Sequence, residues 1–334
     1  MHKIARKSST FVQNPCRART MRRFVLIFFF SALLAVSCRQ SGYYSFTGYA
    51  QGGEYVVKAN LDGVREVPET IGSAIDSILN DIDFSLSGYN RNSLLSKFNS
   101  GEDVVPDRYF NDVLEMSEEY RQITGGAFDV TAGPLFDIWG FGFKTDSLPS
   151  DERVRLALEE CRSGRILNFN AIAQGYSCDV IAGYLRSIGV RDMLVNIGEI
   201  YCEGLNPAGK PWSVGVDNPV DGNNSPGKDM RGVWNSEGRS CGIVTSGNYR
   251  KYYVKDGKKY AHTIDPRTGY PVCHDLLSAT VVAPTAAQAD AFATACMVMG
   301  PEDARKFILS RNDVEGYLIT SEGTWNSPGF PLSD

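Results

Sequence analysis

Apolar residues recur with helical spacing in several parts of the chain. Within residues 67–83 they fall three or four positions apart, which places one apolar stripe on a helix that faces a core. Residues 107–124 repeat this pattern and are followed by Gly125 and Gly126, which are typical of a helix end. The same reasoning predicts further helices over residues 151–160, 171–188, 285–299 and 302–309.

Short apolar or alternating runs between these helices predict strands. They cover residues 49–59, 165–170, 193–197, 212–216 and 316–320, and further strands are expected after Cys241. Residues 86–99 and 217–239 are rich in polar residues and Gly, Asn, Ser or Pro and predict loops, the second of them an exposed insertion. Residues 127–143 are aromatic and glycine-rich and predict a folded-over binding loop. Because helices and strands mix without a repeating βαβ period, the pattern favours an α+β fold over a doubly wound sheet.

The N-terminal 38 residues have the pattern of a targeting segment. A basic start, M-R-R (21–23), precedes an apolar run over residues 24–36, which is long enough for a signal peptide and short for a membrane span. The run ends in L-A-V-S-C (34–38), which resembles the lipobox of a bacterial lipoprotein and implies that Cys38 is lipidated at the mature N-terminus. An ordinary signal peptide and an uncleaved anchor are the alternatives, and all three place the body of the chain outside the cytoplasm.

The chain therefore divides into three segments. Residues 1–38 form the targeting segment, with Met21 as the expected start, residues 39–46 form a tether, and residues 47–334 form the folded domain. The lipobox predicts a lipid-anchored protein of the bacterial cell envelope, facing the periplasm or the outside.

Charge and cysteine content exclude some classes of function. The 334 residues carry a formal net charge of −5 and show no basic stripe, which argues against a nucleic-acid partner. The six cysteines after Cys38 show neither C-x-x-C nor zinc-ligand spacing. An oxidising compartment permits disulfides, but the sequence does not identify the pairs.

The region between residues 245 and 294 holds the most informative polar residues. Asp290 and Thr294 stand four apart on a predicted helix and so lie on one face, where a carboxylate and a hydroxyl suit a hard cation such as Mg²⁺ or Ca²⁺. The alternative is that Asp290 caps or solvates the helix. His262 precedes the turn sequence I-D-P-R-T-G and is a candidate general base, or else a structural hydrogen-bond partner of that turn. His274 has no such context and is expected at the surface.

Eight motifs occur in order along nearly the whole of the predicted domain. They read G-Y-A-Q-G-G-E-Y (48–55), S-G-Y-N-R-N-S-L-L-S-K-F-N (87–99), T-G-G-A-F-D-V-T-A-G-P-L-F-D-I-W-G-F-G (124–142), N-F-N-A-I-A-Q-G-Y-S-C-D (168–179), L-V-N-I-G-E-I (194–200), T-S-G-N-Y-R-K-Y-Y (245–253), H-T-I-D-P-R-T-G-Y-P (262–271) and A-D-A-F-A-T (289–294). With these motifs the chain resembles the ApbE family, the FAD:protein FMN transferases. The resemblance implies an α+β, T-fold-like structure of mixed sheets and helices, with two lobes around a flavin-binding cleft.

The resemblance also implies a role for particular residues. His262 would be the catalytic residue whose loss abolishes transfer. The metal, Mg²⁺ with Ca²⁺ or Mn²⁺ as alternatives, would be held by the carbonyl of Ala171 and the side chains of Asp290 and Thr294. FAD would be the substrate, held by Gln51, Tyr89, Ala127, Phe128, Asp129, Asn168, Gln174 and Ile264. Among the aromatic residues we expect Tyr89 and Phe128 to contact the ligand, and Trp139 and Phe141 to pack in the core.

The sequence departs from the family pattern at three positions. Asn168 stands where relatives often have Asp, Gln174 replaces the usual Lys or Glu, and Ala293 stands where some members have a second acid. Neutral amides still form hydrogen bonds with an adenine or ribityl group. Fewer charges predict weaker metal binding, and the roles of Gln51 and Gln174 rest least firmly on the resemblance.

The reaction implied by the resemblance is metal-dependent transfer of FMN from FAD to a Thr or Ser hydroxyl of an extracytoplasmic acceptor, such as a redox-pump subunit, with release of AMP. Two alternatives remain. One is a metal-dependent FAD pyrophosphatase that gives FMN and AMP, and the other is a non-catalytic flavin-binding lipoprotein.

Overall fold

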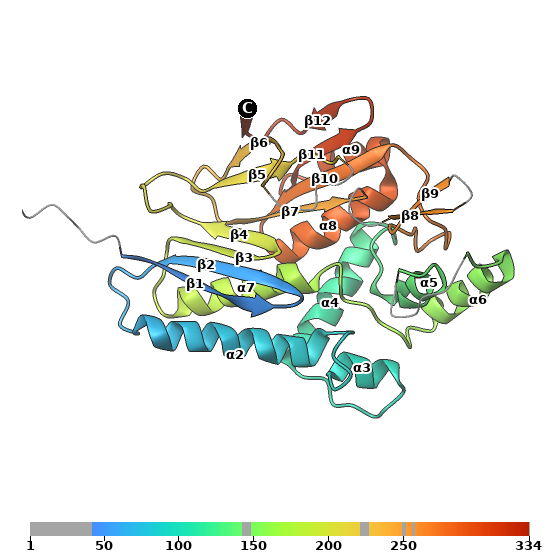
Figure 1. The fold of residues 1–334 in the computed structure, drawn as a ribbon, viewed down its shortest axis with the longest axis horizontal. Helices are drawn as coiled ribbons and strands as arrows, with labels where there is room; N and C mark the ends of the chain where they lie inside the picture. The colour runs from blue at the N-terminus through green and yellow to red at the C-terminus, as the bar shows by residue number, and fades with distance from the viewer. Residues whose placement is uncertain (1–41, 142–147, 221–226, 249–251, 256–257, 334) are drawn as a thin grey trace, which may run out of the picture. The chain divides into compact units, whose positions relative to one another are not determined.

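An antiparallel sheet of eight strands forms the centre of the fold (Figure 1). The computed structural model describes residues 42–141, 148–220, 227–248, 252–255 and 258–333, so the predicted targeting segment and Cys38 lie outside the described residues. In spatial order the strands are β1 (Tyr43–Ala50), β2 (Gly53–Asn60), β3 (Met193–Ile197), β4 (Glu199–Glu203), β7 (Cys241–Gly247), β10 (Leu276–Ala283), β11 (Glu315–Thr320) and β12 (Thr324–Asn326).

Two small sheets complete the strands. One has the order β13 (Leu332–Ser333), β6 (Met230–Asn235) and β5 (Ser213–Asp217), and the other pairs β8 (Tyr252–Lys255) with β9 (Lys258–Ala261). The described helices are α2 (Pro68–Leu86), α3 (Leu94–Asn99), α4 (Arg108–Ile123), α5 (Gly133–Ile138), α6 (Asp151–Arg162), α7 (Ala173–Ser187), α8 (Ala286–Met299) and α9 (Pro301–Leu309), with a 3-10 turn at Val130–Ala132.

The alternation of side chains along β7 explains why both faces of the large sheet are covered. Cys241 and Ile243 face one core together with Trp212 and Trp234 from the region of the β5–β6 sheet. Val244 points to the opposite core, which α4, α7 and α8 share. Successive residues of a strand point to opposite faces. The large sheet therefore lies between the three-stranded sheet of β13, β6 and β5 and a layer of helices (Figure 1).

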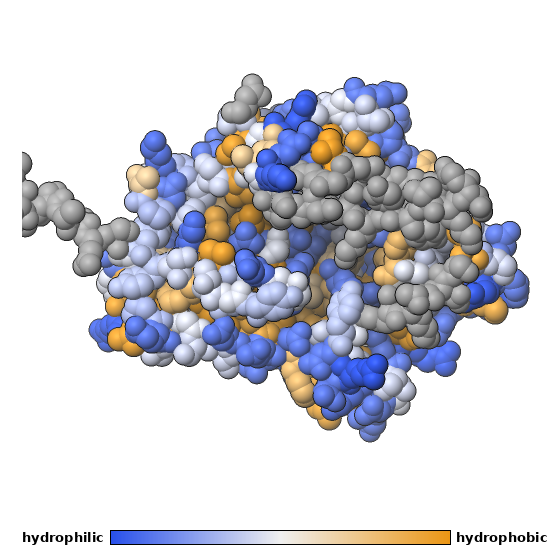
Figure 2. Space-filling view, in the orientation of Figure 1, coloured by the Kyte–Doolittle hydropathy of each residue, from blue (hydrophilic) through white to orange (hydrophobic). Residues whose placement is uncertain are grey.

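Helix α8 is buried on all sides. Eleven of its residues are buried, and the helix packs against β7, β10 and α7. Phe292 packs edge-to-face with Tyr120 of α4 and Phe307 of α9. A helix that is apolar all round belongs inside a protein. The hydroxyl of Thr285 caps its first turn by accepting from the N–H of Gln288 at 3.1 Å. From the viewing side of Figure 2 the surface is mostly polar, and apolar residues show mainly in recesses between the elements.

The predicted α+β class is confirmed, and so are the helices near 67–83, 107–124, 151–160, 171–188, 285–299 and 302–309. Tyr43–Asp334 forms one compact unit, so both sides of the predicted cleft belong to the same unit. Among the helices that the structure describes, none combines the length and apolar character needed to cross a bilayer.

Six expectations about local structure were wrong. Residues 49–59, expected as one strand, contain the turn between β1 and β2, and the expected binding loop after Gly126 contains a 3-10 turn and α5. Residues 43–46, expected in the tether, form the first half of β1. Residues 165–170 form no strand. The side chain of Asn99 accepts a hydrogen bond from the N–H of Leu167 and donates one to its carbonyl, so this backbone is not paired with a strand. The expected loop 86–99 contains α3, which is capped by Ser93, and the expected insertion 217–239 contains β6.

Candidate active site

One cavity of about 350 Å³ collects nearly all of the predicted site residues. Its walls come from the segment after α4, the start of α7, the end of β7, the turn after His262, and α8. Eleven of the twelve predicted residues line it: Tyr89, Ala127, Phe128, Asp129, Asn168, Ala171, Gln174, His262, Ile264, Asp290 and Thr294. The motifs singled out along the chain therefore meet in space.

Gln51 lies at an adjoining cavity of about 530 Å³. The two cavities share Tyr89, Asn170 and Gln174 in their walls. Gln51 sits at the tip of the β1–β2 hairpin with a positive φ of 51°, a conformation that non-glycine residues rarely adopt. Its Nε2 donates to the hydroxyl of Ser177, while its Oε1 is buried and has no hydrogen-bond partner among the described residues. A buried amide oxygen of this kind is suited to accept a hydrogen bond from a ligand.

The carboxylate of Asp290 projects from the buried helix α8 into the first cavity. Asp290 is 5% exposed, and its Oδ2 accepts from the N–H of Gly175 at 3.2 Å. Burial raises the pKa of Asp290 to about 7, and the nearby Asp179 adds to the rise. A buried carboxylate with little compensation favours the approach of a positive charge.

Asp290, Thr294 and Ala171 line the same cavity and offer a carboxylate, a hydroxyl and a backbone carbonyl. Such a set of oxygens fits a hard cation such as Mg²⁺. No group of three or more His, Cys, Asp or Glu side chains that is able to hold a metal occurs within the described residues. A cation here would therefore rely on fewer than three such side chains, together with neutral oxygens and the substrate.

The backbones of α7 and α8 approach closely beside Asp290. A Cβ added at Gly175 would lie 2.3 Å from the carbonyl oxygen of Ala286, so a glycine is required there. On the other side of α8, a Cβ at Gly242 of β7 would lie 2.3 Å from the Cα of Ala286. The carboxylate of Asp179 accepts from the N–H groups of Ala286 and Ala287, each at 2.8 Å. These contacts fix the start of the helix that carries Asp290 and Thr294.

His262 is half-buried at the cavity wall, next to an aromatic ring. It packs edge-to-face with Phe141, with ring centroids 6.4 Å apart. The turn that follows is closed by a bridge between Ile264 and Pro271, and the indole Nε1 of Trp139 donates to the carbonyl of Gly269 at 2.9 Å. The turn is thus held by these two contacts, neither of which involves His262. His262 lines the same cavity as Asp290.

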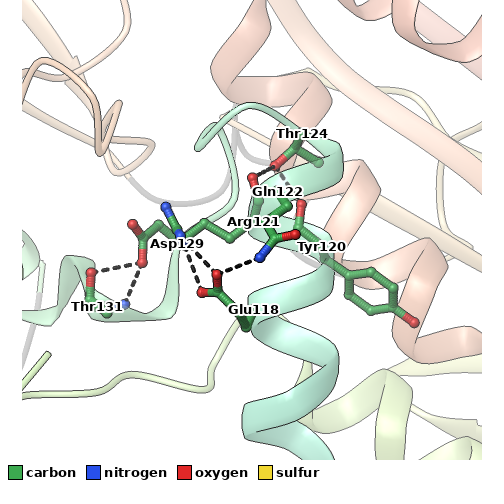
Figure 3. Close-up of polar contacts among 7 residues, drawn as sticks. All are labelled: Glu118, Tyr120, Arg121, Gln122, Thr124, Asp129 and Thr131. Atoms are coloured by element: carbon green, nitrogen blue, oxygen red, sulfur yellow. Dashed lines mark hydrogen bonds and ion pairs between the residues drawn. The ribbon is translucent and has the colours of Figure 1, made fainter.

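The segment Ala127–Asp129 is shaped by the end of α4. The hydroxyl of Thr124 accepts from the N–H of Phe128 at 3.1 Å, and Oδ1 of Asp129 accepts from the N–H and the hydroxyl of Thr131 at 2.8 and 2.7 Å. Figure 3 shows the two contacts of Asp129 with Thr131, beside Arg121, which pairs with Glu118. Asp129 therefore organises its own loop at the cavity wall.

The aromatic residues lie at the cavities, in the core, or at both. Tyr89 is exposed at the junction of the two cavities, and its hydroxyl accepts from Asn170 at 3.2 Å. Trp139 is buried in a core cluster, as expected. Phe128 lines the cavity, and its ring, which is only 2% exposed, packs edge-to-face with Tyr120. Phe141 packs partly buried against the same core cluster as Trp139, as expected, and it also lines the cavity beside His262.

Sequence reasoning also missed several residues. Glu199, Thr245, Ser246, Gly247, Asn170 and Met297 line the cavity without having been assigned a role. The available signals were the acid that follows Gly198 after a buried strand, and the T-S-G sequence at the end of β7. His274, expected at the surface, is half-buried, and its Nε2 lies 3.0 Å from the carbonyl of Met297 near the end of α8.

Comparison with known proteins agrees with this geometry. The family model described as ApbE family matches residues 51–318. The FAD:protein FMN transferase of Escherichia coli K12 is 34% identical over 307 residues, covering 82% of this chain and 84% of that protein. The flavin transferase ApbE of Vibrio cholerae shares 29% identity and a TM-score of 0.72, covering 87% of this chain and 97% of that chain. The flavinyl transferase ApbE of Pseudomonas stutzeri, in its apo form, shares 30% identity and a TM-score of 0.74, covering 86% and 95%.

Proposed function

The chain belongs to the ApbE family, and on that basis we propose that it is an FAD:protein FMN transferase, an enzyme that moves FMN from FAD to a protein. The observation that carries this proposal is that His262, from a loop, and Asp290 and Thr294, from a buried helix, line one cavity. The site thus combines a titratable base with oxygen ligands in one cavity of about 350 Å³.

The two adjoining cavities support a dinucleotide substrate. FAD has two flat ring systems joined by a diphosphate, and the two cavities meet at Tyr89, Asn170 and Gln174. The N-terminus of α7 borders both, since Gln174 lines each of them. A helix N-terminus carries partial positive charge, which favours a phosphate. The buried Oε1 of Gln51 is placed to accept from a ring amine or a hydroxyl of the nucleotide.

The chemical step is attack by a Thr or Ser hydroxyl of the acceptor on the FMN-side phosphorus of FAD. A new phosphoester bond forms, the bond from that phosphorus to the bridging oxygen breaks, and AMP leaves with that oxygen. The imidazole of His262 takes the hydroxyl proton, a role for which a neutral histidine is suited near pH 7. General-base assistance of this kind accelerates a reaction by roughly 10²–10⁴-fold.

Asp290, Thr294 and the carbonyl of Ala171 are the groups proposed to hold a divalent cation, with Mg²⁺ preferred and Ca²⁺ and Mn²⁺ as alternatives. Such an ion, when bound, supplies positive charge beside the diphosphate and the leaving AMP. The negative charge of the buried Asp290 carboxylate would attract that ion. The hydrogen bond from the N–H of Gly175 holds the carboxylate in place.

We further propose that the enzyme acts in the cell envelope, anchored by a lipidated Cys38, on extracytoplasmic acceptors such as redox-pump subunits. The support is the L-A-V-S-C sequence at residues 34–38. Feeding cells a fatty-acid analogue tests the anchor: the wild-type chain is expected to be labelled, and Cys38→Ala is expected to remain unlabelled. A labelled Cys38→Ala variant would contradict the proposal.

One assay separates the proposed activity from its alternatives. The protein is incubated with FAD, Mg²⁺ and a redox-pump acceptor domain, and each product is measured. Fluorescent FMN covalently bound to the acceptor supports the transferase. Free FMN and AMP without labelled acceptor indicate a pyrophosphatase, and unchanged FAD that co-purifies with the chain indicates a flavin-binding protein. His262→Ala serves as the matched control for label that does not depend on the site.

A further inference from the structure

Cys202 and Cys241 lie directly opposite each other on neighbouring strands of the large sheet. The antiparallel register of β4 and β7 pairs Tyr201 with Gly242 and Cys202 with Cys241. Directly opposed residues in such a sheet have Cα atoms about 4.5 or 5.5 Å apart, depending on the type of pair. Both separations fall within the range of about 4.4–6.8 Å seen for disulfides. The backbone therefore already has the spacing that a disulfide requires.

The two side chains also share one environment. Cys202 is fully buried and Cys241 is 5% exposed. Both belong to the core cluster between the large sheet and the β5–β6 strands. Hydrogen bonding between the two thiols raises the pKa of Cys202 and lowers that of Cys241, and the nearby Arg239 guanidinium helps to lower the latter. The two thiols are therefore near enough to affect each other's ionisation, as their pairing in the sheet register also indicates. Both residues are free thiols in the structure.

The other cysteines that the structure describes lack this arrangement. Cys161 and Cys178 lie on separate helices, and the thiol of Cys178 donates to the carbonyl of Glu199 at 3.2 Å. Cys296 is buried in α8, where burial alone raises its pKa to about 12, and Cys273 is exposed. Across the described strands, no other two cysteines are partners in the sheet register.

We propose that Cys202 and Cys241 are a disulfide-forming pair, which a thiol–disulfide oxidoreductase or a small disulfide oxidises to a bond across β4 and β7. The Cys241 thiolate attacks one sulfur of the oxidant's disulfide, forms a mixed disulfide and releases one thiol. The Cys202 thiolate then attacks the Cys241 sulfur, the protein disulfide forms, and the second thiol of the oxidant leaves. Each cysteine loses one proton and one electron, and the oxidant gains two of each.

The bond would join the two ends of the long connection between β4 and β7 of the large sheet. Residues 203–240, between the two cysteines, contain β5 and β6 of the small sheet. A disulfide that closes a loop of this length restricts the unfolded chain, and the chain-entropy relation predicts a rise in Tm of roughly 5–10 °C for the oxidised protein. The inference is independent of the proposed flavin transfer, because neither cysteine lines either cavity of the active site.

The test begins with peptide mapping. The protein is refolded from denaturant in a buffer of reduced and oxidised glutathione, alkylated without reduction, digested and analysed by mass spectrometry. A peptide pair linked through Cys202 and Cys241 is the expected result. Refolded protein in which both cysteines are alkylated, or in which either is linked to a different cysteine, would overturn the proposal.

Thermal unfolding with and without reductant provides a second measurement. The wild type and the control Cys161→Ala are expected to lose the same several degrees of Tm on reduction, because Cys161 lies in a different core cluster. The double variant Cys202→Ser, Cys241→Ser is expected to show no difference. An equal loss on reduction in the double variant would also overturn the proposal. If this variant does not fold, the peptide map of the wild type decides alone.

Discussion

The backbone N–H of Gly175 donates a hydrogen bond to the buried carboxylate of Asp290, with 3.2 Å between the two atoms. The contact joins the first turn of α7 to the middle of α8, and it exists because position 175 has no side chain. The same turn of α7 contributes Gln174 to the cavity, and Ala171 immediately precedes the helix. The close approach of two helices therefore sets where the proposed cation ligands lie relative to Gln174, which lines both cavities.

Gly175→Ala is expected to destabilise the protein and to weaken FAD binding together. A Cβ at this position would lie 2.3 Å from the carbonyl of Ala286, so α7 and α8 would have to move apart. Forced overpacking of this kind costs about 1–3 kcal/mol. Urea unfolding and flavin titration measure the two effects.

Gly183→Ala, two turns later on α7, is the matched control. A Cβ there meets nothing within 4 Å, so the change is expected to raise stability by roughly 0.5–1 kcal/mol through the better helix propensity of alanine. Equal behaviour of the two variants would show that the close approach at Gly175 is not a constraint.

Asp179→Ala is expected to loosen the start of α8. The carboxylate accepts from two backbone N–H groups, of Ala286 and Ala287, which have no partner within the first turn of the helix. Loss of a cap of this type costs about 1–2 kcal/mol, and Asp179→Asn, which keeps one acceptor oxygen, is expected to cost less. Urea unfolding checks the order wild type, Asn, Ala. An alanine variant as stable as the wild type would mean that Thr285 alone suffices as the cap.

The fold was predictable where the chain encodes it locally. Helical spacing near residues 71–82 and a helix-stop glycine pair at 125–126 gave α2 and α4 nearly to their ends. The run 165–170 was misread because its apolar residues are buried by a loop held by Asn99, a contact 68 residues away in sequence. Burial alone does not make a strand when no neighbouring strand is available for pairing.

The site was predictable only in part, for a similar reason. The motifs carried by the family resemblance identified residues such as His262 and Asp290, which the fold then brings to one cavity. The place of Phe141 and of Glu199 in that cavity depends on how loops pack on β7 and α8, and no local pattern encodes it. The close approach at Gly175 joins residues 115 positions apart, and a single sequence offers no signal for it.

Asp290→Asn is expected to abolish the stabilisation of the protein by Mg²⁺ or Mn²⁺. The change keeps the size and one acceptor oxygen but removes the negative charge, which is the main attraction for a cation in this part of the cavity. Thr294→Val is expected to weaken binding less, because a neutral hydroxyl contributes less than a carboxylate. Thermal unfolding across a cation titration measures both. Wild-type stabilisation in Asp290→Asn would place the cation elsewhere.

The half-buried His274 is expected to make the protein less stable in mild acid. Burial lowers the pKa of His274 below its ordinary value, so the unfolded chain binds a proton at a higher pH than the folded chain does. The stability contribution is complete above the unfolded pKa of about 6.5 and is lost as pH falls through the folded pKa. Urea unfolding between pH 7.5 and pH 5 measures this slope. His274→Gln is expected to flatten it, and an unchanged slope in that variant would assign the acid sensitivity to other groups.

His262→Ala is expected to separate catalysis from binding. If the imidazole takes the proton of the acceptor hydroxyl, the variant loses transfer by roughly 100-fold or more while FAD binding stays close to normal. The wild-type rate is then expected to fall in mild acid, because an imidazolium cannot accept a proton.

A structural His262 that supports Phe141 and the turn after it predicts the opposite: weaker FAD binding and a lower Tm in the variant, without an acid limb that depends on this residue. Flavin titration, thermal unfolding and a pH–rate profile of the same preparations therefore distinguish the two roles. Lost binding together with a flat acid limb would remove His262 from the chemistry and leave the proposed cation ligands Asp290 and Thr294 as the groups that carry the reaction.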